Sequence, residues 1–254
     1  MLFVLLLTLF GQDPSSSPAA VPDIAQLSLS TPRAVAEIDA SKLQGDPVRL
    51  AWNADGSLYV RAAQTDRWGN ERAKHYVIAG LGGAPSPTDG EPPWAAAYWL
   101  WKSSSSAPGV PDLRFDIETR EGLKTAVGSD TDGGYSQSRA NPNQPQIERD
   151  LASAQKVRTT TIKLKGELIV ELVNAGFVPG LSFGWAPAPM GVLTFVNDKK
   201  RLIVIDRQGR KREVQGTVDV LLPAWSPDGK RIAYLQKKDK KKYALMTLDV
   251  VVGR

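Results

Sequence analysis

The hydrophobic pattern along the chain consists of short apolar runs separated by polar turns. The clearest case is the stretch PAWSPDGKRIAYLQ from Pro223 to Gln236, where Asp228-Gly229 separates two apolar runs. Asp-Gly between apolar runs indicates a hairpin, because glycine accepts the positive φ that a tight turn between twisted strands requires. The run that follows, Ile232 to Leu235, has the composition of a β-strand.

The same pattern recurs along the chain. Leu50 to Ala62, LAWNADGSLYVRA, again has a tryptophan before Asp-Gly and a strand-like run after it. Phe183 to Val196 keeps the tryptophan and has Met190-Gly191 at the turn, whereas Pro92 to Ser103 keeps the tryptophan and a predicted strand without the Asp-Gly turn. Neighbouring copies lie about 40 residues apart. With about four strands per unit, this period is typical of a β-propeller.

The remaining strands of each unit follow in the same order. A further unit without tryptophan is expected from about Tyr135, with two strands around Lys165-Gly166. Later turns and strands are predicted at Arg120–Gly122, Arg207–Gly209 and Lys241–Val250. The last unit lacks a fourth strand, which a lone strand at Arg33 to Ser41 would supply, hiding an exposed edge. The sequence therefore predicts an all-β fold, a β-propeller of about five four-stranded blades (four or six remain open), closed by this N-terminal strand.

The residues at fixed repeat positions are interpreted as structural. An aromatic side chain that recurs at one position of a repeat belongs to the core, and Asp-Gly forms turns. The residues assigned to structure in this way are Trp52, Asp55, Gly56, Trp94, Trp185, Trp225, Asp228 and Gly229.

The N-terminal segment and the composition limit the function classes. Leu2 to Phe10 is an apolar run too short to span a bilayer, and it fits the hydrophobic region of a secretory signal. We therefore expect residues 1–20 to be a signal peptide with a flexible leader, residues 33–254 to be the propeller, and the mature protein to be periplasmic or secreted without a transmembrane span. The 254 residues include no cysteine and one histidine, which excludes cysteine-based and multi-histidine metal sites, so neither a metal nor a cofactor is expected.

The sequence WSPDGKRIAY, within Pro223 to Gln236, resembles the repeat of TolB-like, WD-repeat-like propellers, which also occurs in the N-terminal propellers of prolyl-oligopeptidase-type peptidases. The resemblance extends over about residues 33–254. The chain has room for only about one strand before its first blade, whereas TolB has a separate N-terminal domain there. The resemblance implies a non-catalytic propeller that serves as a platform for protein partners in the bacterial envelope.

Catalytic alternatives have candidate residues, which the sequence alone does not assemble into a site. His75 could act as a general base if a nucleophile and an oriented acid lay beside it. A propeller glycosidase or lyase would need a carboxylate pair, and a sensor would hold a small ligand in the central channel; both remain alternatives. The available carboxylates are Asp66, Glu71, Asp112, Asp116 and Glu118. Asp130 and Asp132 alternate as in a calcium loop but do not match the EF-hand spacing.

Basic clusters and one tryptophan are the candidates for partner binding. The formal net charge is +5, which favours an anionic partner; an envelope protein is expected, an anionic surface or polysaccharide is the alternative, and nucleic acid is not favoured. Trp68 is predicted at a hairpin tip, where an exposed aromatic often marks a contact. The basic residues predicted at turns are Lys199, Lys200, Arg201, Arg210, Lys211, Arg212, Lys237, Lys238, Lys240, Lys241 and Lys242. If these turns share one rim, they form a positive patch.

Overall fold

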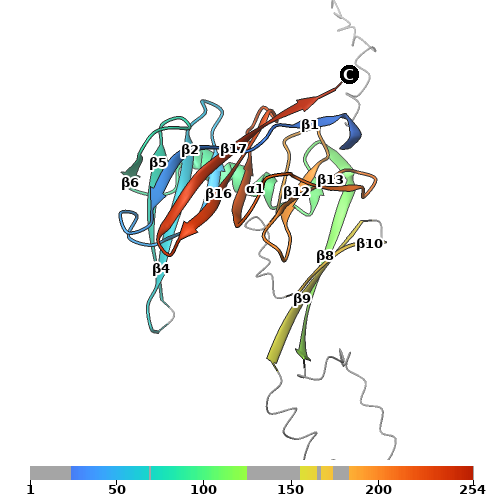
Figure 1. Ribbon diagram of the computed structural model, residues 1–254, viewed down its shortest axis with the longest axis horizontal. Coiled ribbons are helices and arrows are strands. Elements are labelled where there is room, and N and C mark those ends of the chain that lie inside the picture. Colours follow the sequence, from blue (N-terminus) through green and yellow to red (C-terminus); the bar gives the residue numbers. More distant parts are fainter. Residues whose placement is uncertain (1–23, 69, 125–154, 165–166, 174–182, 254) are drawn as a thin grey trace, which may run out of the picture.

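The computed structural model describes residues 24–68, 70–124, 155–164, 167–173 and 183–253. Within these ranges the strands form four separate antiparallel sheets (Figure 1). The prediction of an all-β fold made of antiparallel sheets is confirmed. The predicted signal peptide and leader, the turn at Lys165-Gly166 and the Asp130–Asp132 loop all lie outside the described residues.

Each of the first three sheets has four strands in the order given. The first sheet contains β3 (Asp46–Trp52), β4 (Leu58–Thr65), β5 (Glu71–Ile78) and β6 (Pro85–Thr88). The second contains β7 (Ser106–Ala107), β8 (Val110–Lys124), β9 (Gln155–Leu164) and β10 (Glu167–Val173). The third contains β11 (Phe183–Trp185), β12 (Leu193–Val196), β13 (Leu202–Ile205) and β14 (Lys211–Glu213).

The fourth sheet combines the two ends of the chain. Its C-terminal strands are β15 (Val220–Trp225), β16 (Arg231–Asp239) and β17 (Lys242–Val252). After a short 3₁₀ turn at Ile24–Gln26, β1 (Leu27–Leu29) and β2 (Arg33–Asp39) both pair with β17. The predicted N-terminal strand therefore completes the last sheet and covers the edge of β17. Separate sheets are compatible with propeller blades, but the described part of the chain does not establish a closed propeller ring.

Three buried cores join neighbouring sheets. The first and fourth sheets share a core that includes Trp52, and the fourth and third share one that includes Trp225. The third core contains Trp185 and joins the third sheet to Leu113 and Ile162 of the second. These tryptophans are the last residues of β3, β15 and β11, and each packs where two sheets meet.

The stretch around Trp94 was predicted to be a strand, and this prediction is wrong. Residues Pro93–Lys102 form the only α-helix of the described residues, α1. A proline in the first turn and the run Ala95 to Ala97 favour a helix, since proline has no N–H to lose there and alanine has the highest helix propensity. Trp94 is half-buried on α1, and its roughly 40-residue distance from Trp52 does not reflect a shared place in a repeat.

The turn predicted at Arg120–Gly122 is also wrong. Strand β8 continues through these residues, and Gly122 pairs with Val157 of β9. This glycine has no positive φ, so the backbone gives no turn there. The turns at Asp55-Gly56, Arg207–Gly209 and Asp228-Gly229 are present, with φ of 88° at Gly56, 80° at Gly209 and 69° at Gly229.

Candidate functional site

Three hairpin tips lie at one end of the molecule. These tips are the turns that follow β4, β12 and β16 in the first, third and fourth sheets, and Figure 1 shows them pointing the same way. Hydrogen bonds connect them: Val220 N–H donates to Lys200 O at 3.0 Å, and Lys237 N–H donates to Asp219 O at 3.2 Å. The ion pair between Lys241 Nζ and Asp46 Oδ1, at 3.2 Å, continues this surface to the first sheet. We call this surface the hairpin end.

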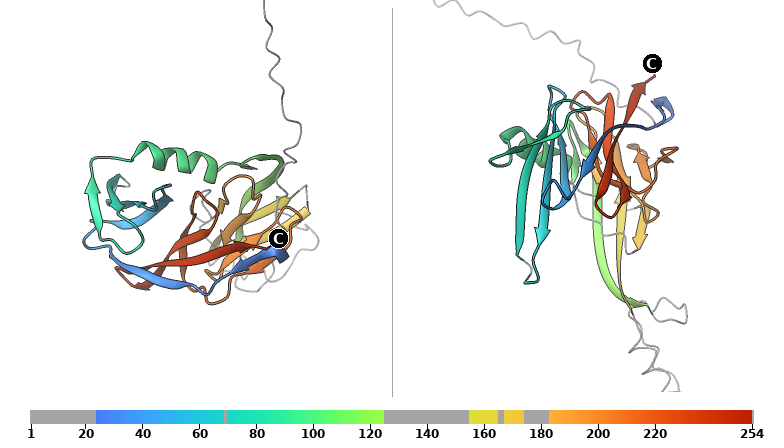
Figure 2. Two further views of the ribbon diagram at one scale, coloured as in Figure 1. Left: turned by 90° about the horizontal axis from the view of Figure 1, so that it is seen from above. Right: turned by 60° about the vertical axis from the view of Figure 1, so that its left-hand side comes forward.

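Trp68 lies on the tip of the β4–β5 hairpin, which projects beyond the sheet (Figure 2). Its side chain is 71% exposed. The tip is held by Asp66 Oδ1, which accepts the main-chain N–H groups of Trp68 and Asn70, both at 2.9 Å. The guanidinium of Arg67 lies 4.0 Å from the centre of the Trp68 ring. A large apolar ring is thus presented to solvent on a hydrogen-bonded turn.

The β16–β17 turn supplies most of the positive charge at the hairpin end. Its five lysines are all exposed: Lys237, Lys238, Lys240, Lys241 and Lys242. Lys241 pairs with Asp46, and Lys238 Nζ donates to Gln236 Oε1 at 2.8 Å. Hydrogen bonds from Ser41 hold the pKa of Asp39 below its usual value, and the charges of Lys42 and Lys242 act in the same direction. Asp39 therefore stays ionised at neutral pH, and the surplus of positive charge at this turn comes from its five exposed lysines.

The β12–β13 turn adds two exposed lysines, Lys199 and Lys200. Arg201 has a structural role instead: its guanidinium donates to Thr217 O, and its N–H donates to Asn197 Oδ1 at 2.8 Å. Its side chain is half-buried and tied to the sheet rather than presented to a partner.

The third basic cluster lies at the opposite end, because the β13–β14 turn reverses the chain once more. There Arg210 Nε donates to the buried carboxylate of Asp206 at 2.9 Å. Arg212 Nη2 donates to Leu27 O at 2.5 Å. Lys211 is exposed on β14. The structure thus brings together two of the three basic clusters with Trp68 and leaves Arg210, Lys211 and Arg212 elsewhere.

The only histidine is engaged with a tyrosine. The hydroxyl of Tyr59 lies 2.6 Å from His75 Nδ1, and the two rings are stacked with centroids 6.0 Å apart. Burial raises the pKa of Tyr59 to about 12, with Glu91 adding to it, so its hydroxyl stays protonated at neutral pH. The described residues contain no group of three histidines or acids that could bind a metal.

The candidate carboxylates form two separate groups, in which Glu71, Asp116 and Glu118 form ion pairs with basic side chains. Asp66 and Glu71 flank the β4–β5 hairpin, and Glu71 forms an ion pair with Arg61. Asp112, Asp116 and Glu118 lie on β8 of another sheet, where hydrogen bonds from Arg120, with Lys163 adding to them, lower the pKa of Glu118. The two groups therefore lie on different sheets, whereas a glycosidase requires two carboxylates that face each other across one site.

One motif that bears on catalysis is Gly180 to Gly184, GLSFG, which has the Gly-x-Ser-x-Gly spacing of a hydrolase nucleophile turn. Such a turn leads from a strand into a helix. Here Phe183 and Gly184 open β11, and the next element is β12, so the motif runs into a strand. Ser182 itself lies outside the described residues.

Comparisons with known proteins identify no family. No protein family and no curated protein matches the chain. Among solved structures there is a similarity to Sqt1 of Chaetomium thermophilum, determined bound to the N-terminus of the ribosomal protein L10. The identity is 13% and the TM-score 0.23, over 80% of this chain and 45% of the Sqt1 chain. This chain therefore spans less than half the length of Sqt1. A TM-score this low does not establish a shared fold or function.

No helix in the described ranges has the length and hydrophobicity needed to cross a membrane.

Proposed function

We propose that this chain is a non-catalytic, TolB-like β-propeller module that binds an acidic region of a protein partner through its hairpin end. The observation that carries the proposal is the placement of exposed Trp68 on the same end as the lysine-rich β16–β17 and β12–β13 turns. The repeated turns and the packed tryptophans support the propeller architecture, and the engaged His75 supports a role without catalysis.

Two physical effects would contribute to binding: burial of the apolar Trp68 ring and electrostatic attraction by the lysines. An exposed tryptophan gains more free energy on burial than any other side chain, and such residues dominate binding interfaces. Lysines on the other turns of the hairpin end accelerate the encounter with an acidic surface and select against basic ones. Binding should therefore weaken steeply with salt, while the Trp68 contribution should be nearly independent of salt.

A location in the bacterial envelope is part of the same proposal. It is supported by the apolar run at Leu2 to Phe10 and the small polar residues after it. Mass spectrometry of the protein isolated from its native host would show a new N-terminus within about the first 30 residues if the segment is removed on export. An intact Met1 in a cytosolic fraction would contradict export and leave the binding role to be tested separately.

The experiment is affinity capture of the tagged full-length chain from crosslinked native envelope, with matched charge variants. The test variant carries Lys237→Gln and Lys240→Gln, both exposed at the hairpin end without an ion pair in the described residues. The control carries Arg207→Gln and Lys230→Gln, two exposed bases on turns at the opposite end. A second comparison sets Trp68→Ala against Leu100→Ala, whose side chain on α1 is 78% exposed.

A protein recovered with the wild type and the two controls but lost with both test variants would support the proposal. Equal recovery with test and control variants would refute the hairpin end as the site. If no protein is captured, and the lysine variant loses binding to anionic vesicles or polysaccharide that the wild type binds, the positive charge serves an anionic surface instead.

A further inference from the structure

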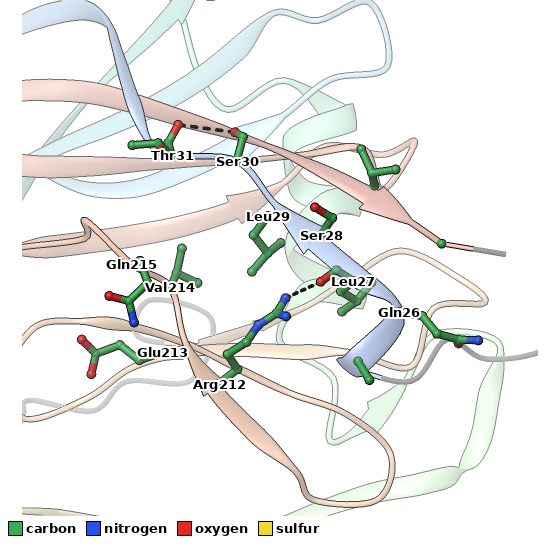
Figure 3. Close-up of a pocket in the computed structure, with 13 residues that line it drawn as sticks. Gln26, Leu27, Ser28, Leu29, Ser30, Thr31, Arg212, Glu213, Val214 and Gln215 are labelled. Carbon is green, nitrogen blue, oxygen red and sulfur yellow. Dashed lines mark hydrogen bonds between the residues drawn. The ribbon is translucent and has the colours of Figure 1, made fainter.

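A groove lies between the edge strands of the third and fourth sheets, on the side of the molecule away from the hairpin end. Figure 3 shows it between β1, above, and β14, below. Its volume is about 490 Å³. Residues 25–31 form one wall, residues 212–215 form the other, and Val251 and Gly253 contribute from the end of the chain.

Strand β1 presents a free main-chain edge to this groove. Gly253 N–H donates to Gln26 O at 2.7 Å, and Ser30 N–H donates to Asp249 O at 3.0 Å. The main-chain N–H and C=O groups of the even-numbered residues in this segment therefore point toward β17. Alternation along a strand directs the main-chain groups of Leu27 and Leu29 the other way. In the described part of the chain, the N–H and C=O of Leu29 have no hydrogen-bond partner.

Arg212 places a guanidinium beside that edge. Its side chain crosses the groove from β14, and Nη2 donates to the outward carbonyl of Leu27 at 2.5 Å (Figure 3). This bond shows that the outward edge of β1 accepts a donor from across the groove. The guanidinium has five N–H donors, and Arg212 forms no ion pair with a carboxylate of the described residues. Its remaining donors are available to a carboxylate.

We propose that the groove binds an extended segment of a partner protein, which adds as a strand along β1 and places an acidic side chain on Arg212. Two features select this occupant. A free N–H and C=O on one residue of an edge strand match the backbone of an extended peptide, and the remaining donors of a guanidinium without an ion pair in the described residues match a carboxylate. The proposal is independent of the function proposed above, because the groove and the hairpin end share no residue.

The test uses the full-length chain and a synthetic probe. The probe is an N-acetylated, C-amidated peptide with the sequence Ser-Val-Glu-Val-Ser-Thr, carrying a fluorophore for anisotropy. One control peptide has glutamine for glutamate, and a second has N-methylated valines, which removes the donors needed for strand pairing. Arg212→Gln and Arg212→Lys are compared with Arg72→Gln, an exposed arginine on β5 outside the groove.

The expected result is saturable binding that falls by a factor of about ten or more with Arg212→Gln and with the glutamine peptide. Arg212→Lys keeps the positive charge but loses the paired N–H donors of the guanidinium, so it should bind the probe more tightly than Arg212→Gln and less tightly than the wild type. Arg72→Gln should bind as the wild type does. Binding of the probe should also slow hydrogen exchange at the amide of Leu29.

Three outcomes would overturn the proposal. One is equal binding of the glutamate and glutamine peptides by the wild type, a comparison that holds even if Arg212 variants fold poorly. Another is binding of the N-methylated peptide with the affinity of the parent. The third is protection of the Leu29 amide without any probe. Protection that depends on protein concentration would identify a second copy as the occupant, and protection that does not would identify another segment of this chain.

Discussion

The side chain of Lys102, at the end of α1, lies directly against the backbone of Gly184 on β11. A methyl group in place of a hydrogen at Gly184 would lie 2.6 Å from Lys102 Cε and 2.8 Å from Cγ. Lys102 is fully buried, and its ammonium lies 4.5 Å from the centre of the Trp99 ring. In the described residues Nζ has no hydrogen-bond partner. The helix is thus docked on the third sheet by the stem of a charged residue.

The contact predicts a coupled pair of substitutions. Gly184→Ala should lower the free energy of unfolding by about 1–3 kcal/mol, because the new methyl overlaps the Lys102 stem. In a Lys102→Ala background the same substitution should cost much less, since the overlapping atoms are gone. Urea denaturation of the four proteins in this cycle measures the coupling. An equal cost of Gly184→Ala in both backgrounds would show that the helix does not dock in this way.

The buried ammonium also predicts how stability depends on pH. Burial lowers the pKa of Lys102 to about 7, well below its value in the unfolded chain. Between about pH 7 and pH 10 the unfolded state therefore binds more protons than the folded state, and stability rises with pH. Below pH 7 the lysine is charged in both states, and the penalty of burying the charge remains in full.

Lys102→Met removes the charge and keeps the stem. It should raise the free energy of unfolding at pH 6 by about 1–4 kcal/mol and flatten the rise between pH 7 and pH 9.5. Lys74→Met, at an exposed position on β5, should change neither. Urea denaturation at several pH values checks this. A pH profile that is the same in Lys102→Met and wild type would mean that the ammonium reaches solvent.

The repeats could be predicted because each tryptophan and Asp-Gly pair acts locally. Gly56 and Gly229 adopt the positive φ that the turns require, and the strands around them follow from alternation. The pairing of the N-terminal strand with β17 was also predictable, because an unpaired edge needs a partner.

The helix α1 and the burial of Lys102 could not be predicted in this way. The sequence around Trp94 matched the repeat by tryptophan spacing, but the alanines and the proline before them favour a helix. A buried lysine has no signal in a single sequence, because its burial depends on Gly184, which is 82 positions away. The separation of Arg210 to Arg212 from the hairpin end follows from antiparallel pairing, because β13 lies between the β12–β13 turn and the β13–β14 turn and so puts them at opposite ends.

The two Asp-Gly turns predict different responses to the same substitution. At Gly56→Ala the new methyl has open space around it, so the only cost is the backbone strain of a φ of 88°, about 1 kcal/mol. Gly229→Ala has a similar backbone strain at a φ of 69°, and its methyl would also lie 2.5 Å from Met190 Sδ. We expect Gly229→Ala to lower the free energy of unfolding by about 1–2 kcal/mol more than Gly56→Ala does. Thermal and urea denaturation would show this difference, and equal losses would contradict the packing of Met190 over this turn.

A buried hydrogen bond from Tyr98 adds to the apolar packing of α1 on the fourth sheet. Tyr98 donates to Trp225 O at 2.8 Å in a buried site, and burial raises the pKa of Tyr98 well above its ordinary value. Tyr98→Phe should therefore lower the free energy of unfolding by about 1–2 kcal/mol, since the carbonyl of Trp225 loses a donor. Tyr234→Phe is the matched control: its hydroxyl is buried and has no hydrogen-bond partner in the described residues, so its removal should be neutral or stabilising. Urea denaturation of the two variants side by side measures the difference. Equal stability would mean that the helix is held by apolar packing alone.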